Sequence, residues 1–168
     1  MSALSLSTCQ AAVLALIASA QANPTRSPRF PDLVGIPVAA ESYTDTTGVA
    51  DAAFEAALNG SSATGLFIFV AYPDAVRVDQ TTPGTARFLA TVPVILCENP
   101  VSNMATGSGG LSRDPAKVVE AIWTAVCHQA QSGPQRFLIS DPLEQVSESS
   151  GCRIWRTLFE CPITWKPT

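Results

Sequence analysis

The stretch LFIFVAY, residues 66–72, decides the fold of this 168-residue chain. It is apolar throughout and is bounded by Gly65 and Pro73, a pattern typical of a strand that is covered on both faces. A second apolar stretch, RFLATVPVILCE, follows at residues 87–98. Together the two stretches predict the centre of a sheet with other elements packed against it.

Prolines refine this prediction at two places. Pro93 interrupts the second stretch, and because proline cannot donate a hydrogen bond to a neighbouring strand, it indicates a bulge or an edge position. The segment at residues 73–86 contains Pro83–Gly84, which predicts a hairpin with this dipeptide at its tip.

The C-terminal segment CRIWRTLFECPITW, residues 152–165, alternates between two sets of side chains and predicts another strand. We expect a further strand to begin at residues 136–139 and a turn at residues 147–151. One face of the C-terminal strand would carry Trp155, Thr157, Phe159, Cys161, Ile163 and Trp165, and the other would carry Ile154, Arg156, Leu158 and Glu160.

Helical patterns occur in three places. Residues 3–21 carry apolar side chains at helical spacing, and residues 51–58 predict a short helix. A longer helix is predicted over residues 114–130, where Asp114 is the N-cap. The proline-rich residues 23–37 predict an extended connector, with one short strand around residues 33–38.

This order of elements predicts an α+β fold. We expect a mostly antiparallel sheet, with the N-terminal helix and the second long helix packed on it. The length corresponds to one domain, residues 1–168.

The chain carries few charges. Charged residues make up 14% of the sequence, whereas about 25% is typical of globular proteins, and the first 25 residues carry no charged side chain. This deficit predicts a subunit whose N-terminal helix and sheet are hidden in an assembly. The formal net charge of −4, with scattered arginines, argues against a protein that grips DNA through its phosphates.

The five cysteines are odd in number and form no CxxC pair, so we expect small buried hydrophobes rather than disulfides or a zinc site. Residues 9–22 have an apolar middle and end in Ala-Gln-Ala, which imitates an export signal. Because no basic residue precedes the apolar run, we interpret the segment as a packed helix. The alternative is a secreted binding domain whose first 22 residues are removed.

The reactive side chains do not predict an enzyme. Cys127 and His128 are neighbours on a helix, where side chains point about 100° apart, so they cannot form a thiol–imidazole pair. The glycines at residues 107–110 lack the Lys-Ser/Thr that follows in a phosphate-binding loop. We therefore expect no catalytic residues, no metal and no cofactor. Loop carboxylate pairs are interpreted as solvated: Asp74 with Asp79, and Glu144 with Glu148.

The order of elements resembles that of tail terminator, or tail completion, proteins of long-tailed bacteriophages. Residues 38–62 would be an embellishment of that family's fold. The segments that carry the resemblance are the helix at residues 11–20, FIFVAYP at 67–73, VPVILCENPVSN at 92–103, DPAKVVEAIWTAV at 114–126 and RTLFECPITW at 156–165.

The resemblance implies a structural virion protein rather than an enzyme. Such a protein forms a ring, usually a hexamer, at the head-proximal end of the tail tube, ends tube polymerisation and docks the head–tail connector. DNA would pass through the lumen as cargo, no membrane would be involved, and assembly would take place in the host cytoplasm. Another neck, connector or tail-tube subunit is the alternative within the same class.

For this function, contacts are expected at residues 73–85, at residues 99–113 and at the ends of the final hairpin, because loops on a rigid sheet carry recognition. The candidate interface residues are Arg77, Asp79, Arg87, Asn99, Arg113, Arg156 and Glu160.

Overall fold

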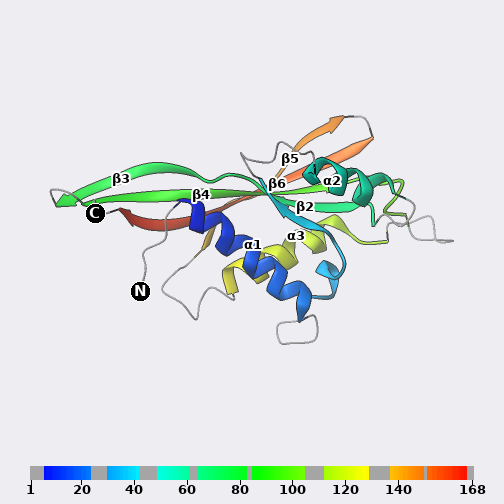
Figure 1. The fold of residues 1–168 in the computed structure, drawn as a ribbon, viewed down its shortest axis with the longest axis horizontal. Helices are drawn as coiled ribbons and strands as arrows, with labels where there is room; N and C mark the ends of the chain where they lie inside the picture. The colour runs from blue at the N-terminus through cyan, green and yellow to red at the C-terminus, as the bar shows by residue number, and fades with distance from the viewer. Residues whose placement is uncertain are drawn as a thin grey trace.

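A six-stranded sheet forms the centre of the molecule, with α-helices on both of its sides (Figure 1). The computed structural model describes residues 6–23, 30–41, 49–60, 64–82, 85–104, 112–128, 137–149 and 151–165. The elements in these ranges are α1 (Leu6–Ala22), the 3-10 turn η1 (Pro31–Leu33), β1 (Val38–Ala40), α2 (Val49–Asn59), β2 (Leu66–Val70), β3 (Asp74–Thr82), β4 (Thr85–Glu98), α3 (Pro115–Trp123), the π-helical turn η2 (Thr124–His128), β5 (Leu138–Ser149) and β6 (Cys152–Trp165).

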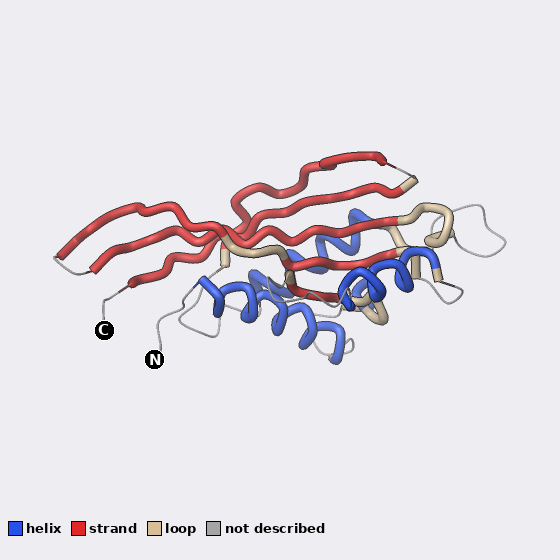
Figure 2. Tube along the Cα trace, turned by 45° about the horizontal axis from the view of Figure 1, so that its top comes forward, coloured by secondary structure: helices blue, strands red, loops and turns tan. Residues whose placement is uncertain are grey.

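The strands are ordered β1, β2, β4, β6, β5, and β3 pairs with β4 off this path (Figure 2). β1 is parallel to β2, and the other pairs are antiparallel. The predicted α+β class with a mostly antiparallel sheet is therefore confirmed.

Pro93 lies in the middle of β4, which is an interior strand and continuous through this residue. No bulge interrupts the pairing with β6, but the expected edge position holds locally, because neither β2 nor β3 pairs with β4 at Pro93. The Pro93 carbonyl accepts a hydrogen bond from Ala71 N at 2.9 Å, in the crossover between β2 and β3. Because the N–H and C=O of a strand residue point to the same side, the missing donor also faces this crossover, where neither strand is paired with β4.

The side of the sheet toward α1 and α3, called the helix face below, carries the main apolar core. The packed first helix is confirmed. Its Gln10 amide donates to the carbonyls of Glu41 and Val70 at 3.0 Å each, which links α1 to the residues at the ends of β1 and β2. The buried side chains of this core include Cys9, Val13, Ile17 and Ala20 of α1, Val118, Val119 and Ile122 of α3, and Ile68, Val70, Val92, Val94, Leu96, Phe159 and Cys161 of the strands.

The opposite side of the sheet, called the second face, is covered at one end by α2. Phe54 packs edge to face on Phe67, with ring centroids 5.5 Å apart, and Leu58 and Cys97 are buried in the same cluster. Residues 38–62 supply both β1 and α2, so they contribute an edge of the sheet and the cover of this smaller core.

The α3 helix begins as predicted, because the Asp114 carboxylate accepts a hydrogen bond from Ala116 N at 3.0 Å. It ends differently: residues 124–128 form a π-helical turn, in which the Thr124 hydroxyl donates to the Glu120 carbonyl at 2.9 Å. The predicted end of this helix, at residues 129 and 130, lies outside the described residues.

Two other boundaries need correction. The strand expected at residues 33–38 is β1, which begins only at Val38, because a 3-10 turn and Gly35 with φ of +73° precede it. The turn expected at residues 147–151 is shorter, because β5 stays paired with β6 as far as Ser149 opposite Cys152. Gly151, with φ of +81°, provides the left-handed backbone of this tight turn.

The predicted hairpin at residues 73–86 is confirmed as β3 and the start of β4, whose pairing continues to Thr82 opposite Thr85. Its expected tip, Pro83–Gly84, lies outside the described residues. Together with the end of β6, this hairpin forms the part of the sheet that extends beyond the helices at the left of Figure 1. We call residues 76–82, 85–89 and 162–165 the arm.

Candidate interaction surfaces

The structure distributes the predicted interface residues over three places. One group lies at the end of the sheet opposite the arm, the second on the arm and the third in the middle of β6. The groups are Asn99 with Arg113, Arg77 with Asp79 and Arg87, and Arg156 with Glu160.

At the end opposite the arm, the buried side chain of Asn103 connects both ends of a loop. Its amide nitrogen donates to Glu98 Oε1 at 3.0 Å and to the Arg113 carbonyl at 2.8 Å, and its oxygen accepts from Arg113 N at 3.1 Å. Asn103 N also donates to the Asn99 carbonyl at 2.9 Å. One asparagine thus fixes the loop that follows β4 to the start of the next helix.

Asn99 positions the same loop from its other side. Its amide nitrogen donates to the Leu58 carbonyl at 3.2 Å and to Asn59 Oδ1 at 2.8 Å, which ties the loop to the end of α2. Its side-chain oxygen accepts from Val101 N at 3.0 Å. Asn99 was predicted as an interface residue, and the structure gives its side chain this positioning role.

Gly65 lies directly against the backbone of this loop. Its φ is +71°, and a Cβ on it would lie 2.4 Å from Asn103 N. The Gly65 carbonyl accepts from Asn99 N at 2.8 Å, and Gly65 N donates to the Ala57 carbonyl at 3.1 Å. Only glycine permits both this backbone conformation and this close approach.

Glu98 places a carboxylate inside this network. The side chain is completely buried, and its Oε2 lies 4.0 Å from Arg153 Nη1 and makes no hydrogen bond in the described part of the chain. Sequence reasoning did not identify Glu98, Asn103, Gly65 or Arg153 as a unit. The available signal was a glutamate that ends an apolar strand directly before Asn-Pro.

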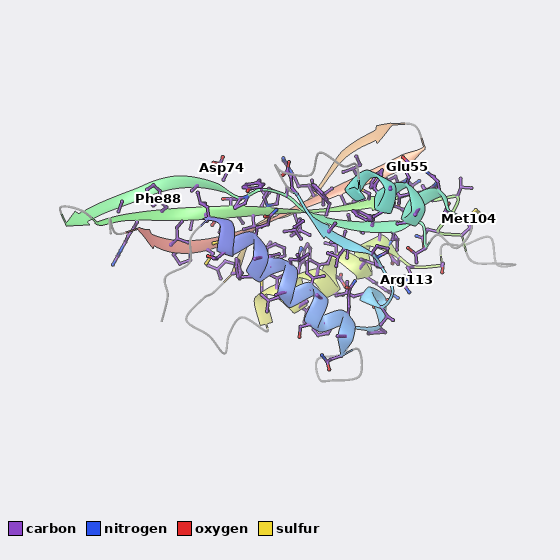
Figure 3. All side chains as sticks on the ribbon, in the orientation of Figure 1. Glu55, Asp74, Phe88, Met104 and Arg113 are labelled. Atoms are coloured by element: carbon purple, nitrogen blue, oxygen red, sulfur yellow. The ribbon has the colours of Figure 1, made fainter. Side chains whose placement is uncertain are left out.

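The loop fixed in this way presents apolar side chains to solvent. Val101 is 77% exposed and Met104 is 51% exposed. Figure 3 shows Met104 at the end of the molecule opposite Phe88 of the arm. Arg113 lies beside the loop, and its guanidinium donates to the Asp32 carbonyl at 3.5 Å. We call Val101 and Met104 the apolar tip.

On the arm, the backbones of Asp79 and Arg87 are paired between β3 and β4, and Arg77 is opposite Phe88. Arg87 is exposed, and Phe88 packs partly against the core of the helix face. The side chains of Arg77 and Asp79 lie outside the described part of the structure. The arm therefore places at least one exposed arginine far from the apolar tip.

In the middle of β6, Arg156 and Glu160 lie on the same face, as the alternation predicted. Arg156 is opposite Ile95 of β4, and Glu160 is opposite Thr91. The Ser140 hydroxyl donates to Glu160 Oε1. Both charged side chains are partly exposed on the second face.

The cysteines are free thiols. Burial raises the pKa of Cys127, which disfavours its thiolate. Cys9 of α1 and Cys161 of β6 hydrogen-bond to each other, and this contact together with burial raises the pKa of Cys161. The His128 side chain and residues 107–110 lie outside the described residues.

Within the described ranges, no group of three or more His, Cys, Asp or Glu side chains is arranged to hold a metal ion. None of the described helices is long and apolar enough to cross a bilayer.

No protein-family model matches this chain, and no curated protein matches it.

Proposed function

We propose that this chain is a structural subunit of a bacteriophage tail, a terminator that forms a ring at the head-proximal end of the tail tube. The ring, expected to be a hexamer, ends polymerisation of the tube protein and offers a docking face to the head–tail connector. DNA passes through its lumen without being gripped.

The observation that carries this proposal is the difference between the two ends of one sheet. A ring of identical subunits needs two different, complementary patches on each subunit. Here the apolar tip lies at one end of β4 and the arm lies at the other. The strand has 14 residues and is about 45 Å long at about 3.3 Å per residue, so the far end of the arm is distant from the apolar tip.

The charge distribution also supports a subunit of an assembly. The outward side of α1 is formed by exposed but uncharged residues, including Ala11, Ala15 and Ala18. A net charge of −4, repeated around a ring, gives an acidic assembly that repels the DNA backbone. Both features are expected of a subunit that hides its neutral surfaces and surrounds passing DNA.

The direct test is the mass and shape of the purified chain, with and without the tail-tube protein of the same phage. We expect rings in negative-stain images, and addition of the chain should stop growth of tail tubes. A strictly monomeric species at high concentration, with no ring when tube protein is supplied, would contradict the proposal. Long tubes formed by the chain alone would instead identify a tail-tube subunit.

Point variants locate the contacts. Met104→Glu should leave the melting temperature unchanged, because the side chain is exposed, but it should prevent ring formation. Val34→Glu is the matched control, since Val34 is also an exposed apolar residue and belongs to neither the apolar tip nor the arm. On the arm and beside the loop, we expect the triple change of Arg77, Arg87 and Arg113 to alanine to fold normally and to assemble poorly. Normal rings from both the triple variant and Met104→Glu would refute the assignment of these surfaces.

A further inference from the structure

The pair Asn59–Gly60 lies at the end of α2 and combines two chemically reactive neighbours. Because glycine has no side chain, its backbone nitrogen can approach the carboxamide of the preceding asparagine without obstruction. The other asparagines, at positions 23, 99 and 103, are followed by proline, proline and methionine. Proline has no N–H, and the methionine side chain hinders the approach. Asn59 is therefore the asparagine of this chain that is most prone to attack by its neighbour.

Such a pair reacts by deamidation, and water is the only co-reactant. The Gly60 nitrogen loses its proton and forms a bond to Cγ of Asn59. The bond from Cγ to the side-chain nitrogen breaks, and ammonia leaves, so the product is a cyclic succinimide. Water then adds to one of the ring carbonyls and opens the ring. This leaves either aspartate or isoaspartate in place of the asparagine.

In the folded chain, hydrogen bonds keep the two reacting groups apart. Gly60 N donates to the Ala56 carbonyl at 3.1 Å, which continues the helical pattern of α2. Asn59 Nδ2 donates to Glu55 Oε2 at 2.8 Å, and Asn59 Oδ1 accepts from Asn99 Nδ2 at 2.8 Å. The attacking nitrogen and the carboxamide are thus each bound to another partner. The backbone must leave the helical conformation before they can meet.

The last turn of α2 lies where it can open locally. Asn59 and Gly60 are exposed, so water reaches both. Leu58, directly before them, is completely buried and holds the rest of the helix on the sheet. Helix ends open far more often than the whole chain unfolds. The reaction can therefore proceed from the folded protein, at a rate that the side-chain contacts of Asn59 limit.

We propose that Asn59 is a site of deamidation, and that Glu55 and Asn99 set its rate by holding the carboxamide in its folded position. The new carboxylate takes the place of an amide that donates to the Glu55 carboxylate. Like charges four residues apart destabilise a helix, and so does a negative charge at its C-terminus. Deamidation therefore weakens the end of α2, to which Asn99 ties the loop that carries the apolar tip. Figure 3 shows Glu55 and Met104 toward the same end of the molecule.

Peptide mapping of the full chain by mass spectrometry, after incubation in mildly alkaline buffer, measures the reaction. We expect Asn59 to convert first among the four asparagines. The chain unfolded in urea should react at least about tenfold faster than the folded chain. Glu55→Ala and Asn99→Ala should each accelerate the reaction of the folded chain about two- to tenfold, which corresponds to the net contribution of one hydrogen bond.

Matched controls remove the same residue types elsewhere. Glu120→Ala removes an exposed glutamate of α3, and Asn23→Ala removes an exposed asparagine after α1. Neither should change the rate at Asn59. Circular dichroism and the melting temperature establish that each variant is folded. Equal rates in folded and unfolded wild type, or Glu55 and Asn99 variants that react no faster than wild type, would overturn the proposal.

The structural consequence has its own test. Asn59→Asp reproduces the charge of the product and should lower the melting temperature more than Asn23→Asp does. The control adds the same charge at the end of α1, where Asn23 donates to the Ser19 carbonyl at 3.1 Å instead of to a carboxylate. Equal losses would overturn the predicted weakening of α2. The reaction requires neither a ring nor a partner, so these outcomes are separate from those that test the proposed function.

Discussion

The helix face and the second face of the same sheet differ in how completely other elements cover them. On the helix face, two helices cover the strands, and Val92, Val94 and Phe159 are at most 1% exposed. On the second face, one short helix covers one end, and Leu158 and Pro93 stay in contact with solvent. Stability is therefore concentrated on one face, which leaves the other face and the sheet ends available for partners.

The largest expected difference between the faces is in core packing. Ile122→Ala removes a side chain that is 1% exposed under the helix face and should lower the free energy of unfolding by about 2 to 5 kcal/mol. Leu158→Ala on the second face should lower it by about 1 kcal/mol, because the site is partly hydrated already. Urea unfolding at low protein concentration measures both. Equal losses of unfolding free energy in the two variants would contradict this difference between the faces.

At the end of the sheet opposite the arm, the hydrogen bonds of Asn103 should stabilise the fold about as much as apolar packing does elsewhere. Asn103→Ala leaves the Glu98 carboxylate and the backbone groups of Arg113 without their partner, and should lower the free energy of unfolding by about 2 to 4 kcal/mol. Urea unfolding again provides the measurement. Ser102→Ala, one residue earlier on a partly exposed side chain, is the control and should change stability little. A loss below 1 kcal/mol for Asn103→Ala would show that the loop does not depend on this side chain.

Substitutions at two glycines distinguish the cost of backbone strain from the cost of a steric clash. Gly65 and Gly35 have φ of +71° and +73°, but an added Cβ meets the Asn103 backbone at Gly65 and nothing within 4 Å at Gly35. Gly35→Ala should destabilise by about 1 kcal/mol, and Gly65→Ala by about 2 kcal/mol more. Thermal melts of the two variants check this difference. Equal destabilisation by the two variants would mean that the loop containing Asn103 moves away from Gly65 without a cost in free energy.

The smallest effect concerns pH and the covered end of the second face. Burial, with a contribution from Cys152, raises the pKa of Cys97 from 9.0 to about 11. The folded state therefore holds this proton more tightly than the unfolded state, so the stabilisation is complete below pH 9 and is lost as the pH rises toward 11. Wild type should lose about 1 kcal/mol more than Cys97→Ala between pH 8 and pH 10. Parallel stability curves for the two proteins would contradict the raised pKa.

The elements were predictable where the signal is local. The apolar run at residues 66–72, the alternation in β6 and the Asp114 N-cap each depend on neighbours in sequence, and each is present in the structure. Pro93 indicated a bulge or an edge, and the choice between these two depends on where β2 and β3 separate beside β4. That separation is a property of the whole sheet.

The candidate surfaces were predictable only in part. The positions of Arg156 and Glu160 followed from alternation, but their neighbours on the adjacent strands required the register of β4 and β5. Asn103 and Gly65 have side-chain and backbone contacts that the tertiary fold creates, between segments that no sequence period connects. Residues that fix a loop in this way are visible only once its neighbours are in place.

Cys9 of α1 and Cys161 of β6 lie in the same core, so this core joins distant parts of the chain. Gln10 of the same helix donates a hydrogen bond to the carbonyl of Val70, which is 60 residues away in the sequence. Contacts between such distant parts of a chain slow folding, because a long loop must close before they form.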